Sequence, residues 1–83
     1  MVVDDDEFIQ KLLDDVLNAE GFAVVPTSSA EDAQKTLLRV VPDLFVVDIM
    51  LPGIDGLELC RVIRKTPSVA DRPILILSSK HSV

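Results

Sequence analysis

Apolar and polar residues fall into blocks along this chain, and the blocks switch between strand-like and helix-like spacing. Four short apolar runs are typical of buried strands. They lie at residues 2–3, 22–25, 44–47 and 73–77. Between them, apolar residues recur every three or four positions, which predicts helices. These helices are expected over residues 8–17, 30–38 and 56–65. The alternation predicts an α/β fold, in which helices cover both faces of a parallel sheet.

Capping and turn residues support the predicted helix ends. Asp6 and Glu7 lie where acids stabilise the start of the first helix, and Gly21 follows its last turn. For the second helix, either Ser28 with Glu31 or Ser29 with Asp32 fits a capping box. Asp55 is the expected cap of the third helix. The side chains of the last two helices predicted to face the core are Ala30, Ala33, Leu37, Leu38, Leu59, Cys60 and Ile63.

Carboxylates follow two of the apolar runs directly. The first run ends on Asp4, Asp5 and Asp6, and the third ends on Asp48, just before a Pro-Gly turn. Right-handed crossovers bring the carboxyl ends of parallel strands to one rim, which would gather these side chains. Such a cluster repels itself unless a cation or a proton lies within it. The sequence therefore predicts a metal site at this rim.

Oxygen ligands of this kind suit Mg²⁺. Asp5 and Asp48 would bind the ion directly, and Asp4 through a water. A carboxylate beside bound Mg²⁺ can attack a phosphoryl group, because the metal neutralises charge on the transferring oxygens. Ser78, at the end of the fourth run, could donate a hydrogen bond to one of those oxygens, and backbone N–H groups near Met50 could bind others. The product would be an acyl phosphate on aspartate.

Composition narrows the function further. The formal net charge of −6 leaves no basic stripe for nucleic acid, and the apolar runs are too short to span a membrane. The chain has no secretory start, and its single cysteine suits a reducing compartment. We therefore expect a cytoplasmic domain without nucleic-acid or membrane partners.

Three segments together resemble a known family. VVDDDE, PDLFVVDIMLPGIDGLELCRVIR and RPILILSS are similar to the CheY-like receiver domain of two-component response regulators. The resemblance covers residues 1–83 and implies a flavodoxin-like, doubly wound parallel sheet with strand order 2-1-3-4. It also implies that the domain is a signalling module rather than an enzyme, although it assists its own phosphorylation and dephosphorylation.

The resemblance assigns roles to individual residues. Asp48 would accept a phosphoryl group from a phosphohistidine on a sensor histidine kinase or a phosphotransfer protein. Asp4 and Asp5 would form the acidic pocket, the Met50 backbone carbonyl would complete the Mg²⁺ shell, and Ser78 would be the switch residue.

The chain departs from the family after its fourth predicted strand. It stops near the start of the family's fourth helix, so we expect it to lack the last helix-strand-helix portion and the Lys that pairs with the phosphoryl group. The chain is then either a fragment of a receiver or a naturally abbreviated one. We expect this incomplete receiver to be impaired in phosphoryl transfer. Because residues 73–77 then form an apolar edge, we also expect self-association through that strand or by element exchange.

Two alternatives start from the same residues. The acids after the first strand also resemble the start of haloacid-dehalogenase-type phosphohydrolases, with Asp4 as nucleophile and Asp6 as acid/base. Glu7 and Phe8 follow where that family has small residues and Thr. The other alternative is a non-phosphorylated receiver-like module that only binds a protein. The missing Lys favours it, whereas the intact acid pocket disfavours it.

Overall fold

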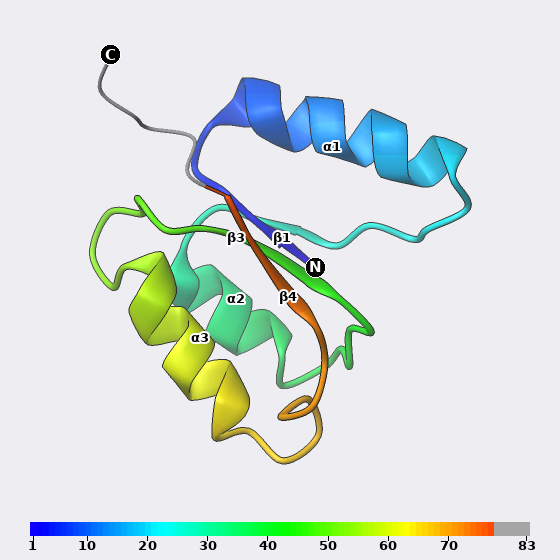
Figure 1. Cartoon of the computed structure of the whole chain (residues 1–83). Helices are drawn as coiled ribbons and strands as arrows, with labels where there is room; N and C mark the ends of the chain where they lie inside the picture. The colour runs from blue at the N-terminus through cyan, green and yellow to red at the C-terminus, as the bar shows by residue number, and fades with distance from the viewer. Residues whose placement is uncertain (78–83) are drawn as a thin grey trace.

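The computed structural model of the chain describes residues 1–77, which form four strands and three helices (Figure 1). The strands are β1 (Val2–Val3), β2 (Pro26–Thr27), β3 (Phe45–Asp48) and β4 (Ile74–Leu77). The helices are α1 (Glu7–Ala19), α2 (Ala30–Thr36) and α3 (Gly56–Arg64). The predicted Ser78 site lies outside the described residues.

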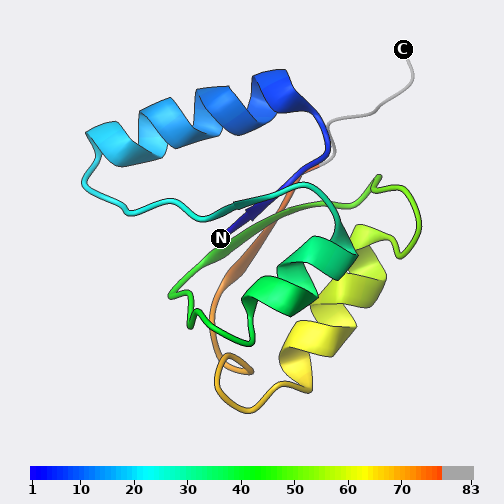
Figure 2. The same ribbon diagram turned by 180° about the vertical axis from the view of Figure 1, so that it is seen from behind.

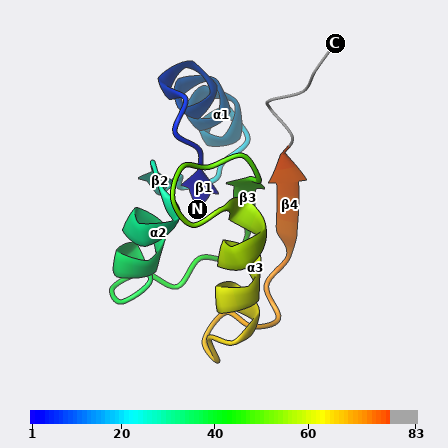
Figure 3. The ribbon, with the colours of Figure 1, turned by 90° about the vertical axis from the view of Figure 1, so that its left-hand side faces the viewer.

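The four strands form one parallel sheet in the order β2-β1-β3-β4. In Figure 3, α1 lies on one side of the sheet, and α2 and α3 lie on the other. The predicted doubly wound, flavodoxin-like architecture with strand order 2-1-3-4 is therefore confirmed. In this strand order β1 and β3 are neighbours, so their carboxyl ends lie side by side, which is where a site can form.

The hydrophobic core lies between the sheet and the α2–α3 layer. Because side chains alternate along a strand, Val3, Phe45 and Val47 point to the same face, and all three are fully buried. They pack with Leu59 and Ile63 of α3, two of the side chains that the sequence pattern placed in the core. This layer packs against one face of β3, whose carboxyl end bears Asp48.

Within the described residues, α1 is the one helix that covers the opposite face of the sheet (Figure 2). Val2 and Val46 are buried there, but no residue of α1 itself is buried. Phe8, on this helix, is 74% exposed. The edge strand β4 lies to one side of α1 (Figure 3), and none of the described helices covers it on that face. One side of this sheet is therefore only partly covered by the described residues.

Two local predictions are wrong. The second strand is not at residues 22–25 but at Pro26–Thr27, because β1 begins only at Val2 and pairs Val2 with Pro26. The backbone before Val25 therefore has no ladder partner, and Pro26 is tolerated because β2 is an edge strand. Leu38, predicted to face the core, is 87% exposed, because α2 ends at Thr36.

The predicted helix caps agree with the structure. Asp6 is the N-cap of α1, and Asp55 is the N-cap of α3. Of the two pairs proposed for α2, the structure uses Ser29 with Asp32, whose carboxylate accepts from the Ser28 N–H. Among the described residues, none of the helices has the length and apolar character needed to cross a bilayer.

Candidate functional site

The register of the central strands determines where the acids meet. β1 and β3 pair Val2 with Val46 and Val3 with Val47. The next residue on each strand is an aspartate, so Asp4 and Asp48 emerge side by side at the carboxyl ends. Parallel pairing with no offset between two Val-Val-Asp segments therefore creates the acidic rim directly from the sequence.

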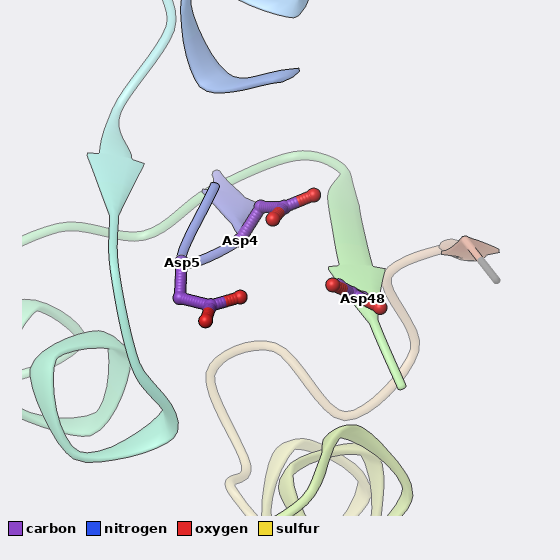
Figure 4. A group of neighbouring side chains, drawn as sticks. All are labelled: Asp4, Asp5 and Asp48. Carbon is purple, nitrogen blue, oxygen red and sulfur yellow. The ribbon is translucent and has the colours of Figure 1, made fainter. Parts of the chain in front are cut away.

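Asp4, Asp5 and Asp48 form one cluster. Each contributes a carboxylate oxygen, and these oxygens all lie within 4.8 Å of one another. Asp4 and Asp5 extend from the segment after β1, whereas Asp48 extends from the end of β3, and the three carboxylates turn toward a common space (Figure 4). The convergence predicted from the sequence is present in the structure. The roles of these residues remain predictions.

In this cluster, the negative charge of Asp4 is unfavourably buried. Its side chain is fully buried, and Oδ1 accepts a hydrogen bond from the Asp6 N–H at 2.9 Å. Oδ2 is also buried, and within the described part of the chain it has no hydrogen-bond partner. Burial raises the pKa of Asp4, the Asp6 N–H opposes this, and the negative charges of Asp48 and Asp5 raise it further.

Asp48 and Asp5 differ in their surroundings. Asp48 is fully buried at the end of β3, and its Oδ1 accepts the Met50 N–H at 2.9 Å. Asp5 is exposed to solvent. The Met50 contact ties the loop after β3 to the Asp48 carboxylate, whereas Asp5 leaves one side of the cluster accessible. Of the predicted set, the structure thus gathers Asp4, Asp5 and Asp48, with Met50 next to them.

The residues present fit a small, hard dication. All three side chains offer oxygen, and carboxylate oxygen is the donor that Mg²⁺ prefers. Moreover, a buried carboxylate oxygen without a partner, such as Asp4 Oδ2, calls for either a proton or a cation. An ion bound there would relieve the repulsion among the three charges.

Sequence reasoning missed two polar residues beside the cluster. Gln10 of α1 donates from Nε2 to the carbonyls of Asp4 and Thr27. Thr27, which is buried, donates from Oγ1 to Val2 O at 3.0 Å. The sequence did give one indication for Gln10. It lies one helical turn after the Asp6 cap, and therefore on the side of α1 where the acids begin. That indication became specific only once β2 was placed correctly.

Comparison with known proteins decides the family. The model of the response regulator receiver domain matches this chain over residues 1–83. The chain belongs to the response regulator receiver domain family. As a receiver domain, it is a signalling module of two-component response regulators, which accords with the acid cluster at the ends of β1 and β3.

Individual relatives agree with this assignment. The receiver domain is 41% identical over 81 residues to the transcriptional regulatory protein AfsQ1 of Streptomyces coelicolor, covering 98% of this chain and 35% of that protein. It is 40% identical over 79 residues to the phosphate regulon transcriptional regulatory protein PhoB of Rhizobium meliloti, covering 95% and 35%. This receiver domain thus spans about a third of the length of these relatives.

Solved structures support the fold. The chemotaxis response regulator CheY4 of Vibrio cholerae superposes with a TM-score of 0.90, at 23% sequence identity, over 98% of this chain and 68% of that one. At this identity the likeness establishes the fold of the receiver domain and nothing about its ligands.

Proposed function

We propose that this domain is a phosphoacceptor, in which Asp48 receives a phosphoryl group from the phosphohistidine of a sensor histidine kinase or phosphotransfer protein. The observation that carries the proposal is the approach of the Asp4, Asp5 and Asp48 carboxylates to within 4.8 Å at the end of β3. A nucleophilic carboxylate needs a fixed direction and a site for the charge of the incoming group. The buried Asp48 supplies the fixed direction, and a cation held by its acidic neighbours would supply the site for that charge.

Asp5 and Asp48 would hold Mg²⁺ directly, together with the Met50 backbone carbonyl, and Asp4 would hold it through a water. When bound, the ion neutralises charge on the phosphoryl oxygens. The Met50 N–H fixes the Asp48 Oδ1 atom.

In the transfer step, an Asp48 oxygen forms a bond to phosphorus while the P–N bond of the phosphohistidine breaks. The electron pair of that bond stays on the imidazole nitrogen of the donor. With acetyl phosphate as donor, the P–O bond to the acetyl group breaks instead and acetate leaves. Ser78 would donate a hydrogen bond to a phosphoryl oxygen after transfer.

Labelling by acetyl phosphate tests this function. Wild type and the Asp48→Asn and Asp71→Asn variants are incubated with acetyl phosphate and MgCl₂, and the intact mass of each is recorded. Asp71 is an exposed carboxylate remote from the cluster, so its variant is the matched control. We expect one added phosphoryl group on wild type and on Asp71→Asn, none on Asp48→Asn, and none in EDTA.

The same experiment separates the alternatives. An adduct that maps to Asp4 would favour the dehalogenase-type mechanism and overturn the role of Asp48. Against that mechanism, the Asp6 carboxylate accepts the N–H groups of Phe8 and Ile9, so it caps α1 instead of facing a substrate. No adduct under any condition would favour the non-phosphorylated binding module.

We also propose that this chain self-associates through the edge of β4. Leu75 and Ile76 are 56% and 45% exposed, and among residues 1–77 β4 is an edge strand of the sheet. An apolar edge with unpaired backbone groups pairs readily with another strand. Sedimentation velocity at increasing concentration should show a rising mean mass, which Leu75→Lys lowers and Leu38→Lys, at an exposed apolar site after α2, does not. A single monomeric species at every concentration would contradict this.

A further inference from the structure

We propose that Gln10 is a positioning residue, whose side-chain amide holds the ends of β1 and β2 together and so sets Asp4 and Asp5 opposite Asp48. This inference rests on the proposed function, because it gives Gln10 a role in the same Mg²⁺ site. Gln10 does not touch the carboxylates in any contact described above. It acts on the backbone from which two of them extend.

Three carbonyl oxygens converge on the Gln10 amide nitrogen. Nε2 is 3.0 Å from Asp4 O and 3.4 Å from Val2 O, and it also bonds to Thr27 O. The Oε1 atom of the same side chain is buried, and it lacks a hydrogen-bond partner within residues 1–77. Since carbonyl oxygens only accept, the amide must direct its two N–H groups toward them, and the side chain has one orientation that fits.

These bonds join three elements at the rim. Gln10 is in α1, Asp4 O belongs to the end of β1, and Thr27 O belongs to the end of β2. The Asp4 N–H also donates to Thr27 O, at 3.1 Å. The Asp4 backbone is therefore held at both its N–H and its carbonyl, while its side chain points to the cluster.

The position of Gln10 also gives it access to the site. Gln10 and Thr27 line a cleft of about 470 Å³ between α1 and the segment after β2, and Asp4 and Asp5 line the same cleft. Because no residue of α1 is buried, the hydrogen bonds of the Gln10 amide to Asp4 O and Thr27 O help to tie the start of that helix to the sheet. Loss of this tie should let the backbone of Asp4 and Asp5 move relative to Asp48.

A Mg²⁺ site is sensitive to such movement, because residues that orient the ligands commonly change metal affinity by about 10- to 100-fold. Gln10→Met keeps the length of the side chain and removes both N–H donors. Thr27→Val is the matched control. It removes a buried donor to the β1 backbone at Val2, but it leaves the Asp4 carbonyl and the Thr27 carbonyl in place.

Two measurements test the inference. Amide hydrogen exchange of Asp4, Asp5 and Asp6 is followed by NMR in EDTA, which reports the backbone without any metal. The Mg²⁺ dissociation constant is measured by titration calorimetry at a temperature where all variants are folded. We expect Gln10→Met to accelerate exchange at these amides and to weaken Mg²⁺ binding about tenfold. Thr27→Val should lower the melting temperature and leave the dissociation constant near that of wild type.

The outcomes are distinguishable. If wild type itself gives no heat of Mg²⁺ binding, the proposed metal site is wrong, and the role of Gln10 in it falls too. If wild type and Gln10→Met bind Mg²⁺ alike, or if Gln10→Met and Thr27→Val weaken binding equally, only the positioning role is overturned. Should Gln10→Met not fold, Gln10→Asn, whose amide is one methylene shorter, takes its place with the same readouts.

Discussion

Gly56 packs directly against the backbone carbonyl of Asp48. A Cβ atom on Gly56 would lie 2.2 Å from Asp48 O and 2.6 Å from Ile49 Cα, closer than any real contact of this kind. The Gly56 N–H also donates to Ile49 O at 3.2 Å. The start of α3 is thus pressed against the end of β3, at the residue we assign as phosphoacceptor. Only a residue without a side chain permits this approach.

Replacing Gly56 by Ala should therefore destabilise the protein. In an exposed helix the same change stabilises by about 1 kcal/mol, but here the new methyl group meets backbone atoms that cannot rotate away. We expect a net loss of about 1–3 kcal/mol in the free energy of unfolding, measured by urea denaturation. The amide resonances of Ile49 and Met50 should also shift, since both lie in the displaced segment.

Gly21→Ala is the control for that change. Gly21 has a φ of +92° and open space around the position of a Cβ atom, so Ala costs backbone strain there but meets no neighbour. It should lower stability by about 1–2 kcal/mol and leave the Ile49 and Met50 resonances unchanged. Equal spectra for the two variants would show that the contact between Gly56 and Asp48 has no effect on the site.

The N-cap of α1 yields a second prediction. Asp6 Oδ1 accepts the N–H groups of Phe8 and Ile9 at 2.9 and 3.2 Å. Asp6→Ala removes both bonds and should cost about 1 kcal/mol in thermal or urea unfolding, whereas Asp6→Ser should restore most of it. Phosphoryl labelling of Asp48 should persist in both variants, because the hydrogen bond from residue 6 to Asp4 uses the backbone N–H. Loss of labelling in Asp6→Ser would instead give Asp6 a chemical role.

These features differ in how well they can be predicted from the sequence. The acid cluster was predictable because two Val-Val-Asp segments in parallel register need no long-range information beyond the pairing itself. The Asp55 cap and the buried Leu59 and Ile63 follow from local helical periodicity. Such features depend on spacing within one element, or on one pairing between two.

Other features depend on distances between elements, and the sequence does not encode them locally. The contacts of Gln10 require the end of β2 to lie at Thr27, and the apolar run at residues 22–25 indicated a different strand. The need for glycine at position 56 arises from its approach to Asp48, 8 positions earlier in the chain, which no turn signal reveals. Leu38 fits the helical stripe, but α2 ends before reaching it.

Cys60 supports a prediction about pH. Burial raises the pKa of its thiol, and the nearby Arg64 and Arg61 guanidinium groups lower it in part. A raised pKa leaves a smaller thiolate fraction at any pH below it, and the thiolate is the reactive form. Carbamidomethylation by iodoacetamide, followed by intact mass, should thus be slower than in urea-unfolded protein at pH 8, and the difference should narrow as the pH rises above the folded-state pKa.

Arg61→Gln provides the check on that assignment. Arg61 forms an exposed pair with Glu58 at 2.9 Å, so its removal should leave the fold intact. Without this positive charge the thiolate is less favoured, and labelling at pH 8 should slow further. A faster rate in Arg61→Gln, or equal rates in folded and unfolded protein, would show that the surroundings of Cys60 do not suppress its ionisation.

The most direct consequence of the acid cluster concerns Asp4→Asn. The substitution removes a buried charge, but the amide oxygen can still accept the Asp6 N–H that Asp4 Oδ1 accepts. In EDTA, we expect the variant to be more stable than wild type by about 1–2 kcal/mol, since sites built for function are often destabilising. In MgCl₂, wild type should gain stability as the ion binds the folded state, and Asp4→Asn should gain much less.

Melting curves in EDTA and across a MgCl₂ series measure both effects, with Asp71→Asn as the control for the loss of one carboxylate. Asp71 is exposed and remote, so its variant should follow wild type in both conditions. We expect wild type to be less stable than Asp4→Asn in EDTA and more stable at high Mg²⁺. This crossing is specific for an ion at Asp4, because a general effect of net charge would shift the melting temperatures of Asp4→Asn and Asp71→Asn alike. If Asp4→Asn is less stable than wild type in EDTA, the buried Asp4 charge is already balanced without a cation, and the repulsion that motivates the metal site is absent.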